Sequence, residues 1–193
     1  MSLPTHLVTA RLRLRPPTAS DADWIAREIA HPEVAPKLTS LPFPYTLDDA
    51  QAWLDGMGHQ NGVYIIVSGF TESGLTESDL TGSCDPIGSV TVKSDPEWAE
   101  LGYWLCRAHW GQGYMTEAAR AVLAAYFSVR PGPVVSGHVL DNLQSANTLR
   151  KLGFANTEVF TQATARGEVE VQKMTLTRSV WLDHAKVPGD IPV

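Results

Sequence analysis

Hydrophobic and polar residues alternate near the start of the chain in the way that a half-buried strand requires. Over residues 7–15, Leu12 and Leu14 alternate with three arginines, and a pair of prolines follows directly. A period of two that ends at proline predicts a strand over this range.

The spacing of apolar residues then changes to the period of an amphipathic helix. Alanine and isoleucine residues fall on one helical face over residues 22–29, Ser20 or Asp21 can cap this helix, and His31-Pro32 ends it. A second, short helix is expected after Thr46, because threonine is a good N-cap.

The rest of the chain consists of apolar, β-branched runs and two helical stretches. Residues 69–85 are rich in Ser, Thr and Gly and are expected to form an exposed hairpin loop. The other predicted elements are strands over 63–70, 87–93 and 99–106, a helix over 116–127, a strand over 134–140, a helix over 142–152, and two strands that follow Phe154 and separate near Arg166-Gly167.

This order of elements predicts the fold class. Strands and helices that do not strictly alternate indicate a mixed α+β sheet rather than a doubly wound one. The length of 193 residues suits a single domain, which we place at residues 1–182. Residues 183–193 contain two prolines and a glycine and are expected to be a loosely held tail.

The composition argues against several classes of partner and site. The chain carries 15 Lys and Arg against 21 Asp and Glu, a net charge of -6. Nucleic acids and anionic membranes are bound by clustered cations, so neither is an expected partner. No apolar run approaches the roughly 20 residues of a membrane span, and residues 1–10 do not resemble a signal peptide. Cys84 and Cys106 do not suggest a disulfide framework, and no two histidines have metal-ligand spacing, so we expect a metal-free protein of the reducing cytoplasm.

Residues 100–117 carry the strongest chemical signal. A buried strand leads into a glycine-rich turn, which continues directly as a helix. The first N–H groups of a helix lack internal partners, and Gly111 and Gly113 would let an anion approach them closely. Backbone amides of residues 112–116 could therefore bind a diphosphate, although glycines at such turns also occur without a ligand. The run is neither a P-loop nor a dinucleotide-binding fingerprint, which disfavours nucleotide hydrolases and dehydrogenases.

Two segments of the chain together resemble a known family. Glu100-Leu-Gly-Tyr-Trp-Leu followed by Trp110-Gly-Gln-Gly-Tyr-Met-Thr-Glu-Ala118 is similar to the acetyl-CoA loop of the GNAT N-acetyltransferases, and most of all to their RimJ/RimL branch. The segment from Asp141 to Phe154 resembles the Asn-x-x-Ser…Lys-Leu-Gly-Phe signature of the same branch. The loop departs from the superfamily pattern at its first and last positions, which are Trp110 and Met115 here.

The resemblance covers nearly the whole chain and implies a fold and a ligand. The fold is a mixed, mostly antiparallel sheet of about seven strands with helices on both faces, splayed between the fourth and fifth strands. Acetyl-CoA would lie in the resulting cleft as the co-substrate, and an amine would be the acceptor.

The resemblance also implies roles for individual residues. Glu100 stands where many members have a general base, and Ser145 where this branch has a general acid for the departing thiolate. Tyr45 and Tyr103 would line the acceptor pocket. The residues implied in cofactor binding, through backbone or side chain, are Leu105, Arg107, Trp110, Gly111, Gln112, Gly113, Tyr114, Met115, Thr116, Asn142, Asn147 and Lys151.

Each of these roles has a structural alternative. Glu100 can be an exposed strand residue or an ion-pair partner, with Glu97 and Asp95 as the fallback bases. Ser145 can satisfy its own helix backbone. Asn142 can be a plain N-cap. His138, on the strand that would line the cleft, can assist proton transfer or simply be packed.

The function as a whole also has alternatives. An N-acetyltransferase acting by direct attack in a ternary complex competes with a non-catalytic GNAT-like module that binds coenzyme A, and with a generic nucleotide-binding protein. The acceptor can be a protein N-terminus or a small-molecule amine, and a homodimer is the default assembly.

Overall fold

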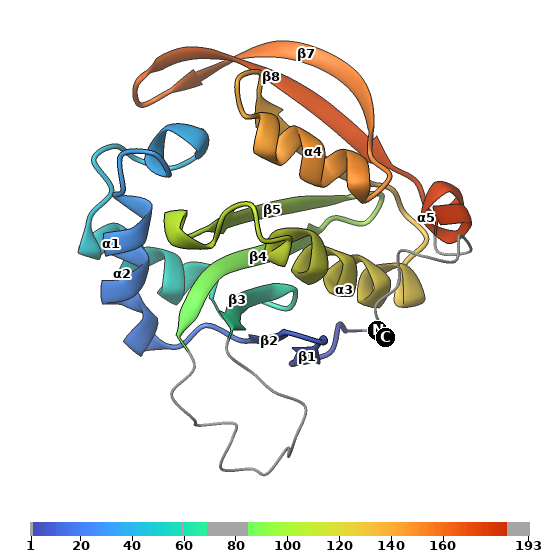
Figure 1. Ribbon diagram of the computed structural model, residues 1–193, viewed down its shortest axis with the longest axis horizontal. Coiled ribbons are helices and arrows are strands. Elements are labelled where there is room, and N and C mark those ends of the chain that lie inside the picture. Colours follow the sequence, from blue (N-terminus) through green and yellow to red (C-terminus); the bar gives the residue numbers. More distant parts are fainter. Residues whose placement is uncertain (1, 59, 69–84, 185–193) are drawn as a thin grey trace.

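The protein is one open sheet with helices against both faces (Figure 1). The computed structural model describes residues 2–58, 60–68 and 85–184. Its sheet has eight strands in the order β1-β2-β3-β4-β5-β6-β8-β7. Neighbouring strands are antiparallel except β5 and β6, which are parallel. The predicted hairpin loop lies outside the described residues apart from Asp85, as does the tail beyond residue 184.

The elements agree with most of the ranges expected from the sequence. The strands are β1 Leu7–Val8, β2 Leu12–Arg15, β3 Val63–Ser68, β4 Pro86–Ser94, β5 Ala99–Leu105, β6 Val134–Val139, β7 Ala155–Thr164 and β8 Gly167–Leu176. The α-helices in the described part of the chain are α1 Ala22–Ile29, α2 Leu47–Gly56, α3 Tyr114–Val129, α4 Leu143–Lys151 and α5 Arg178–His184.

The single strand expected over residues 7–15 is a tight hairpin of two strands, which raises the count from about seven to eight. The Thr9 N–H donates to the Leu12 carbonyl at 2.9 Å and closes the turn. The turn also engages helix α3, because the Thr9 hydroxyl and the Arg11 N–H both donate to the Glu117 carboxylate. The alternation of apolar residues did not predict this turn, because the carboxylate that stabilises it, that of Glu117, lies more than a hundred positions away in the sequence.

Helix α5 was not expected from the sequence. Its Trp181 is buried and stacks on Phe127 of α3, with ring centroids 5.8 Å apart. The Arg178 guanidinium donates to the Phe127 carbonyl at 3.1 Å. Asp183 and His184 therefore belong to this helix, rather than to the tail expected from residue 183 onward.

Two apolar clusters, one on each face of the sheet, hold the helices. Tyr64 and Ile66 of β3 belong to the cluster that α3, α4 and α5 cover. Ile65 and Val67, between and after them, belong to the cluster that α1 and α2 cover. Successive side chains of a strand point to opposite faces, so this alternation confirms the expected arrangement of helices on both faces.

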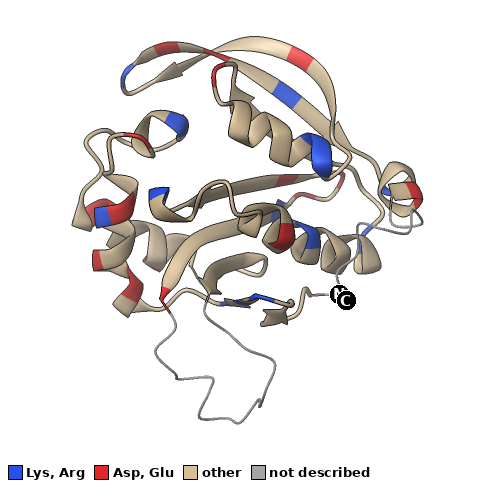
Figure 2. Ribbon diagram, viewed as in Figure 1, with Lys and Arg blue, Asp and Glu red and all other residues tan. Residues whose placement is uncertain are grey.

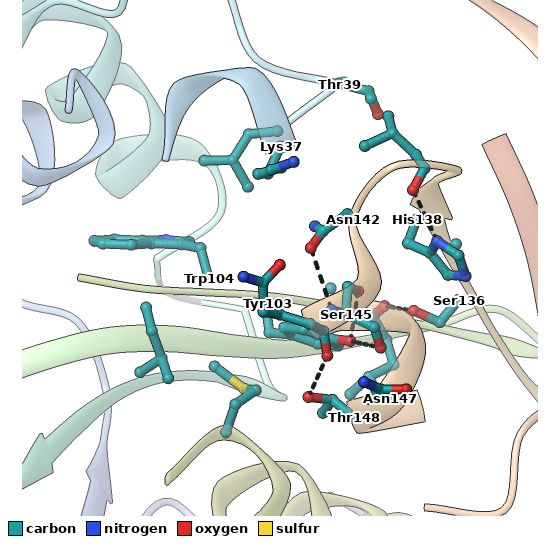
Figure 3. A pocket seen from close by; sticks show the side chains of 18 of the residues that line it. Lys37, Thr39, Tyr103, Trp104, Ser136, His138, Asn142, Ser145, Asn147 and Thr148 are labelled. Atoms are coloured by element: carbon teal, nitrogen blue, oxygen red, sulfur yellow. Dashed lines mark hydrogen bonds between the residues drawn. The ribbon is translucent and has the colours of Figure 1, made fainter. Parts of the chain in front are cut away.

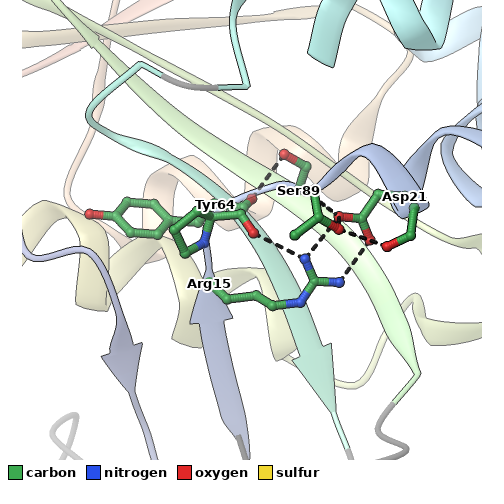
Figure 4. A network of polar contacts seen from close by, with 7 residues as sticks. Arg15, Asp21, Tyr64 and Ser89 are labelled. Atoms are coloured by element: carbon green, nitrogen blue, oxygen red, sulfur yellow. Dashed lines mark hydrogen bonds and ion pairs between the residues drawn. The ribbon is translucent and has the colours of Figure 1, made fainter. Parts of the chain in front are cut away.

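A buried ion pair fixes the start of α1 against the sheet (Figure 4). The Arg15 guanidinium donates two hydrogen bonds to the Asp21 carboxylate, at 2.8 and 2.7 Å. Burial raises the pKa of Asp21, but the bonds from Arg15 and Thr18 outweigh it, so the net pKa lies below its usual value. In the same region, the Ser89 hydroxyl donates to the Tyr64 carbonyl at 3.0 Å. The carboxylate thus stays ionised and orients α1.

The sheet opens between β5 and β6. These two strands pair only through their first two residues, Ala99 and Glu100 of β5 with Val134 and Val135 of β6. Just beyond this point the Ser136 hydroxyl donates to the Leu101 carbonyl at 2.8 Å, in place of a backbone bond. This confirms the expected splay, because β5 and β6 are the fourth and fifth strands of the sequence-based count.

Candidate active site

A cleft of about 860 Å³ occupies the splay and reaches both faces of the sheet. On one face the Tyr103 hydroxyl of β5 meets Ser145 of α4. On the other face, Trp104 of the same strand stacks on Trp24 of α1, with ring centroids 5.2 Å apart. We call the first face the α4 side of the cleft. We call the second the strap side, because several residues of the segment 34–40, which we name the strap, line it.

The turn before α3 has the geometry that its glycines predict. Gly111 and Gly113 have φ values of 75° and 80°, in the left-handed region that favours glycine. A Cβ added at Gly111 would meet nothing within 4 Å, so backbone conformation rather than space accounts for the residue. Gly113 is the N-cap of α3, and the free N–H groups of the first turn begin there.

A short 3-10 helix over Arg107–His109 separates β5 from this turn. The Trp110 indole N–H reaches back to the Leu105 carbonyl at 2.9 Å. Met115 is buried and belongs to the core cluster that α3 covers. The two departures from the family pattern are therefore accommodated, one by a hydrogen bond and one by burial.

Tyr103, Ser145 and Asn142 form a polar chain on the α4 side (Figure 3). The hydroxyl oxygens of Tyr103 and Ser145 are 2.8 Å apart. The Ser145 N–H donates to the Asn142 side chain at 3.2 Å, which makes Asn142 the N-cap of α4. Burial raises the pKa of Tyr103 to about 12, against a smaller lowering by the Ser145 bond. The phenol therefore keeps its proton at neutral pH and can donate it to Ser145.

His138 lies on β6 beside this chain (Figure 3). Its Nδ1 is 2.9 Å from the Val139 carbonyl, and because a carbonyl only accepts, Nδ1 carries the proton. Nε2 is buried without a hydrogen-bond partner among the described residues. An inaccessible Nε2 favours the packed alternative for His138 over a part in proton transfer.

Glu100 stands on the strap side, exposed at the closed end of the splay. It faces the same way as Trp104, because residues four apart on a strand share a face. Among the described residues its carboxylate has neither a hydrogen-bond nor an ion-pair partner. It is thus free to accept a proton from a group bound in the cleft.

The strap is held over this side by a few polar contacts from distant parts of the chain. The Lys37 ammonium is 3.3 Å from the Asp141 carboxylate. The Thr39 hydroxyl donates to the Gln162 side chain of β7 at 3.4 Å. Arg166, between β7 and β8, donates to the carbonyl of Ala35, and its guanidinium lies over the Phe43 ring, 4.9 Å from the centroid.

The structure brings most of the predicted site residues together in the cleft. Lys151, with Arg150, occupies the last turn of α4, where Figure 2 shows basic residues gathered. The predicted residues that line the cleft are Glu100, Tyr103, Leu105, Trp110, Gly111, Gly113, Tyr114, Met115, Thr116, Asn142, Ser145, Asn147 and Lys151.

Three predicted residues do not line the cleft. Tyr45 is buried in the apolar cluster under α1 and α2, and burial raises its pKa to about 12. The Arg107 side chain turns outward to Glu33, at 2.8 Å. The Gln112 carbonyl accepts from Arg11 at 3.1 Å. In addition, Tyr103 contacts Ser145 on the α4 side, although the sequence predicts that it lines the acceptor pocket together with Tyr45.

Several lining residues were not predicted. Trp98, Phe160 and Lys173 line the cleft together with the strap. Neither their residue types nor their spacing signals this. Phe160 and Lys173 reach the cleft because the β7–β8 hairpin joins the sheet through the pairing of β8 with β6, and Trp98 lies directly before β5. Ser136 had a detectable signal, since it is a polar residue that follows two valines in a predicted strand.

Two further properties follow from the described residues. They contain no cluster of three or more His, Cys, Asp or Glu side chains placed to hold a metal ion. Of the helices described, none has the length and apolar character to cross a membrane.

Comparisons with known proteins agree with this geometry. The family model described as the acetyltransferase (GNAT) domain matches residues 11–155. A protein of Bacillus licheniformis named uncharacterized N-acetyltransferase p20 is 29% identical over 157 residues, which cover 77% of this chain and 81% of that one.

Solved structures share the fold at low sequence identity. The ribosomal-protein-S5-alanine acetyltransferase from Vibrio fischeri matches with a TM-score of 0.68 and 16% identity, over 92% of this chain and 99% of that one. The microcin C7 self-immunity acetyltransferase MccE, in complex with acetyl-CoA and AMP, matches with a TM-score of 0.70 and 16% identity, over 90% and 97% of the two chains. Because the family model spans well over half of its length, this chain belongs to the GNAT family and is an acetyltransferase.

Proposed function

We propose that this acetyltransferase transfers the acetyl group of acetyl-CoA to a primary amine by direct attack in a ternary complex. The observation that carries the proposal is the cleft through the sheet. It has the Glu100 carboxylate, without a partner in the part of the chain that the structure describes, on one face, and the hydrogen-bonded hydroxyls of Tyr103 and Ser145 on the other. Removal of a proton from an amine calls for a base such as a carboxylate, and return of a proton to a thiolate calls for a donor such as a hydroxyl.

The open edge of β5 is suited to the pantetheine arm. The Leu101 carbonyl faces β6, since it accepts from Ser136. Backbone groups alternate in direction along a strand, so the Tyr103 and Leu105 N–H groups face the same open edge. An extended amide chain would add there as a further strand. The diphosphate would lie at the N-terminus of α3, against the amides of residues 112–116.

In the proposed reaction the neutral amine attacks the thioester carbonyl carbon, and a new C–N bond forms. Glu100 takes the proton that the nitrogen loses, directly or through a water. The oxygen of the tetrahedral intermediate is stabilised by a β5 amide, for which the Leu105 N–H is the candidate. We expect no acyl-enzyme on Cys106, because this cysteine is buried and burial raises the pKa of its thiol to about 12, which disfavours the thiolate.

The C–S bond then breaks and coenzyme A leaves as a thiolate. Ser145 donates the proton that this sulfur takes up, and Tyr103 returns a proton to Ser145 across their 2.8 Å contact. Tyr103 then regains a proton from solvent, to which Glu100 releases the one that it took from the amine. Burial raises the pKa of Tyr103 to about 12, so the phenol is fully protonated again at neutral pH.

We further propose that the chain belongs to the RimJ/RimL-like branch and acts in the cytoplasm. The signature over residues 141–154 supports the branch, as does the shared fold of the ribosomal-protein-S5-alanine acetyltransferase. The acceptor is either a protein N-terminus or a small-molecule amine. A free, buried Cys106 is compatible with a reducing compartment.

The experiment is to follow thiol release from acetyl-CoA across a panel of peptides and small amines, with mass spectrometry of the products. We expect free coenzyme A to appear in step with an acetylated amine. Tight binding of coenzyme A by calorimetry, without thiol release for any acceptor, would instead identify a non-catalytic binding module. Stoichiometric acetylation of Cys106 would contradict direct attack.

A further inference from the structure

Arg11, in the turn between β1 and β2, contacts the turn before α3 from outside the cleft. Its guanidinium donates to the Glu117 carboxylate at 2.7 Å through Nε, and a second nitrogen lies 2.6 Å from the same oxygen. A third nitrogen donates to the Gln112 carbonyl at 3.1 Å. The guanidinium carbon lies 4.6 Å from the centre of the Tyr114 ring. One side chain thus joins the first strands to both ends of the turn.

The contact with Gln112 determines how one peptide group is turned. The carbonyl of Gln112 and the N–H of Gly113 belong to the same peptide unit, and in a trans peptide they point in opposite directions. When Arg11 holds the carbonyl on its own side, the Gly113 N–H points the other way. Gly113 itself lines the cleft. The guanidinium therefore selects the peptide orientation that offers an N–H, rather than a carbonyl oxygen, to an anion.

The contact with Glu117 offsets the negative charge of that carboxylate. Glu117 lies in the first turn of α3, where a carboxylate usually interacts well with the helix dipole. Burial raises the pKa of Glu117, but hydrogen bonds from Thr9 and Arg11 outweigh it, so the net pKa is lowered and the group is ionised at neutral pH. An unpaired carboxylate there would repel a diphosphate bound to the same helix end. Arg11 supplies the compensating charge.

We propose that Arg11 is a positioning residue for acetyl-CoA, which turns the Gly113 N–H toward the diphosphate and offsets the charge of Glu117. The proposal rests on the proposed function only in that it places the diphosphate at this turn. It assigns Arg11 no contact with the reacting atoms.

The test compares two acyl donors that differ in the diphosphate. Acetyl-CoA carries it, whereas S-acetylpantetheine has the same thioester arm without diphosphate or adenosine. For Arg11→Ala we expect the Kd of coenzyme A and the KM of acetyl-CoA to rise by about tenfold to a hundredfold, the range that charge-assisted hydrogen bonds span. The kcat with saturating acetyl-CoA and the kcat/KM for S-acetylpantetheine should stay unchanged.

Further variants separate the two contributions of Arg11. Arg11→Lys keeps the charge but loses the fork that reaches Gln112 and Glu117 together, so an intermediate Kd is expected. Arg11→Ala combined with Glu117→Gln should recover part of the lost affinity, because no carboxylate then needs to be offset. The matched control is Arg27→Ala on α1. The Arg27 side chain is 67% exposed and, of the residues described, pairs with the adjacent Glu28 alone. This variant should leave the Kd of coenzyme A and the kcat/KM for both donors unchanged.

If Arg11→Ala and Arg11→Lys lowered kcat/KM equally for acetyl-CoA and S-acetylpantetheine, the proposal would be overturned, because a merely structural residue would affect both donors alike. An unchanged Kd for coenzyme A would overturn it as well. Failure of the double variant to recover any affinity would refute the charge offset. If no amine is acetylated at all, the proposed function fails, yet the calorimetric affinities for coenzyme A still decide the role of Arg11.

Discussion

The two sides of the cleft are built from different kinds of contact. On the α4 side, two glycines with positive φ and an Asn142 cap only three residues from Ser145 set the geometry. On the strap side, the contacts that hold the strap join residues 104 to 131 positions apart in the sequence. The α4 side therefore depends largely on local conformation, and the strap side on the packing of distant loops.

This difference explains why the co-substrate can be inferred more readily than the acceptor. A turn that favours glycine and a helix start that favours asparagine can each be recognised from a short stretch of sequence. A strap that lies over a sheet face through single polar contacts can be changed by substitutions at its distant ends. In the proposed function the strap side would take the acceptor, and it could vary while the α4 side, which would take acetyl-CoA, is retained.

The largest expected effect comes from Glu100→Gln on the strap side. Without a base the amine keeps its proton at neutral pH, so kcat should fall by about a hundredfold or more and recover in part at alkaline pH. The measurement is the pH–rate profile, with binding of coenzyme A by calorimetry as the check that the α4 side is intact. Asp55→Asn, which changes an exposed carboxylate of α2 outside the cleft, is the control, and Glu97→Gln tests the alternative base. An unchanged profile would remove Glu100 from this role.

The next effect is expected on the α4 side, for Ser145→Ala and Tyr103→Phe. Each should lower kcat by about tenfold to a hundredfold with little change in acceptor KM, because each interrupts proton return to the thiolate. The double variant should be no slower than the slower single variant, since the two hydroxyls act in series. Fully multiplicative losses in steady-state kinetics would argue that they act independently.

A smaller effect is expected for Arg166→Ala, which releases the strap from the β7–β8 hairpin. The acceptor KM should rise by about tenfold while the KM of acetyl-CoA stays the same, because only the strap side loses an ordering contact. Arg166→Lys should restore part of the loss through the Ala35 carbonyl, without the stacking on Phe43. Equal changes in both KM values would mean that the two sides are not independent.

The smallest effect on activity is expected for Asp21→Asn, which lies outside the cleft. Since the folded-state pKa of Asp21 is lowered, its contribution to stability is present above the unfolded pKa of about 4 and is lost as pH falls through the folded value. Denaturant unfolding at pH 7 should show a loss of about 2 kcal/mol that shrinks toward pH 3. A constant loss across this range would contradict an ionised Asp21.

Features that depend on local conformation could be predicted from the sequence, whereas features that depend on contacts between distant residues could not. The turn at Gly111 and Gly113 and the cap at Asn142 were predictable because their conformations are local. Arg11 was counted as one arginine of a strand, although it reaches Glu117 across the fold. Tyr45 was expected in the cleft but is buried among apolar residues, since an aromatic residue beside a helix start serves a core as readily as a pocket.

The decisive experiment is a crystal structure of the protein with coenzyme A. We expect the diphosphate against the amides of residues 112–116, the pantetheine along the open edge of β5 beyond Leu101, and the sulfur beside Ser145. Coenzyme A bound outside the splay, or a diphosphate away from the start of α3, would contradict this expectation.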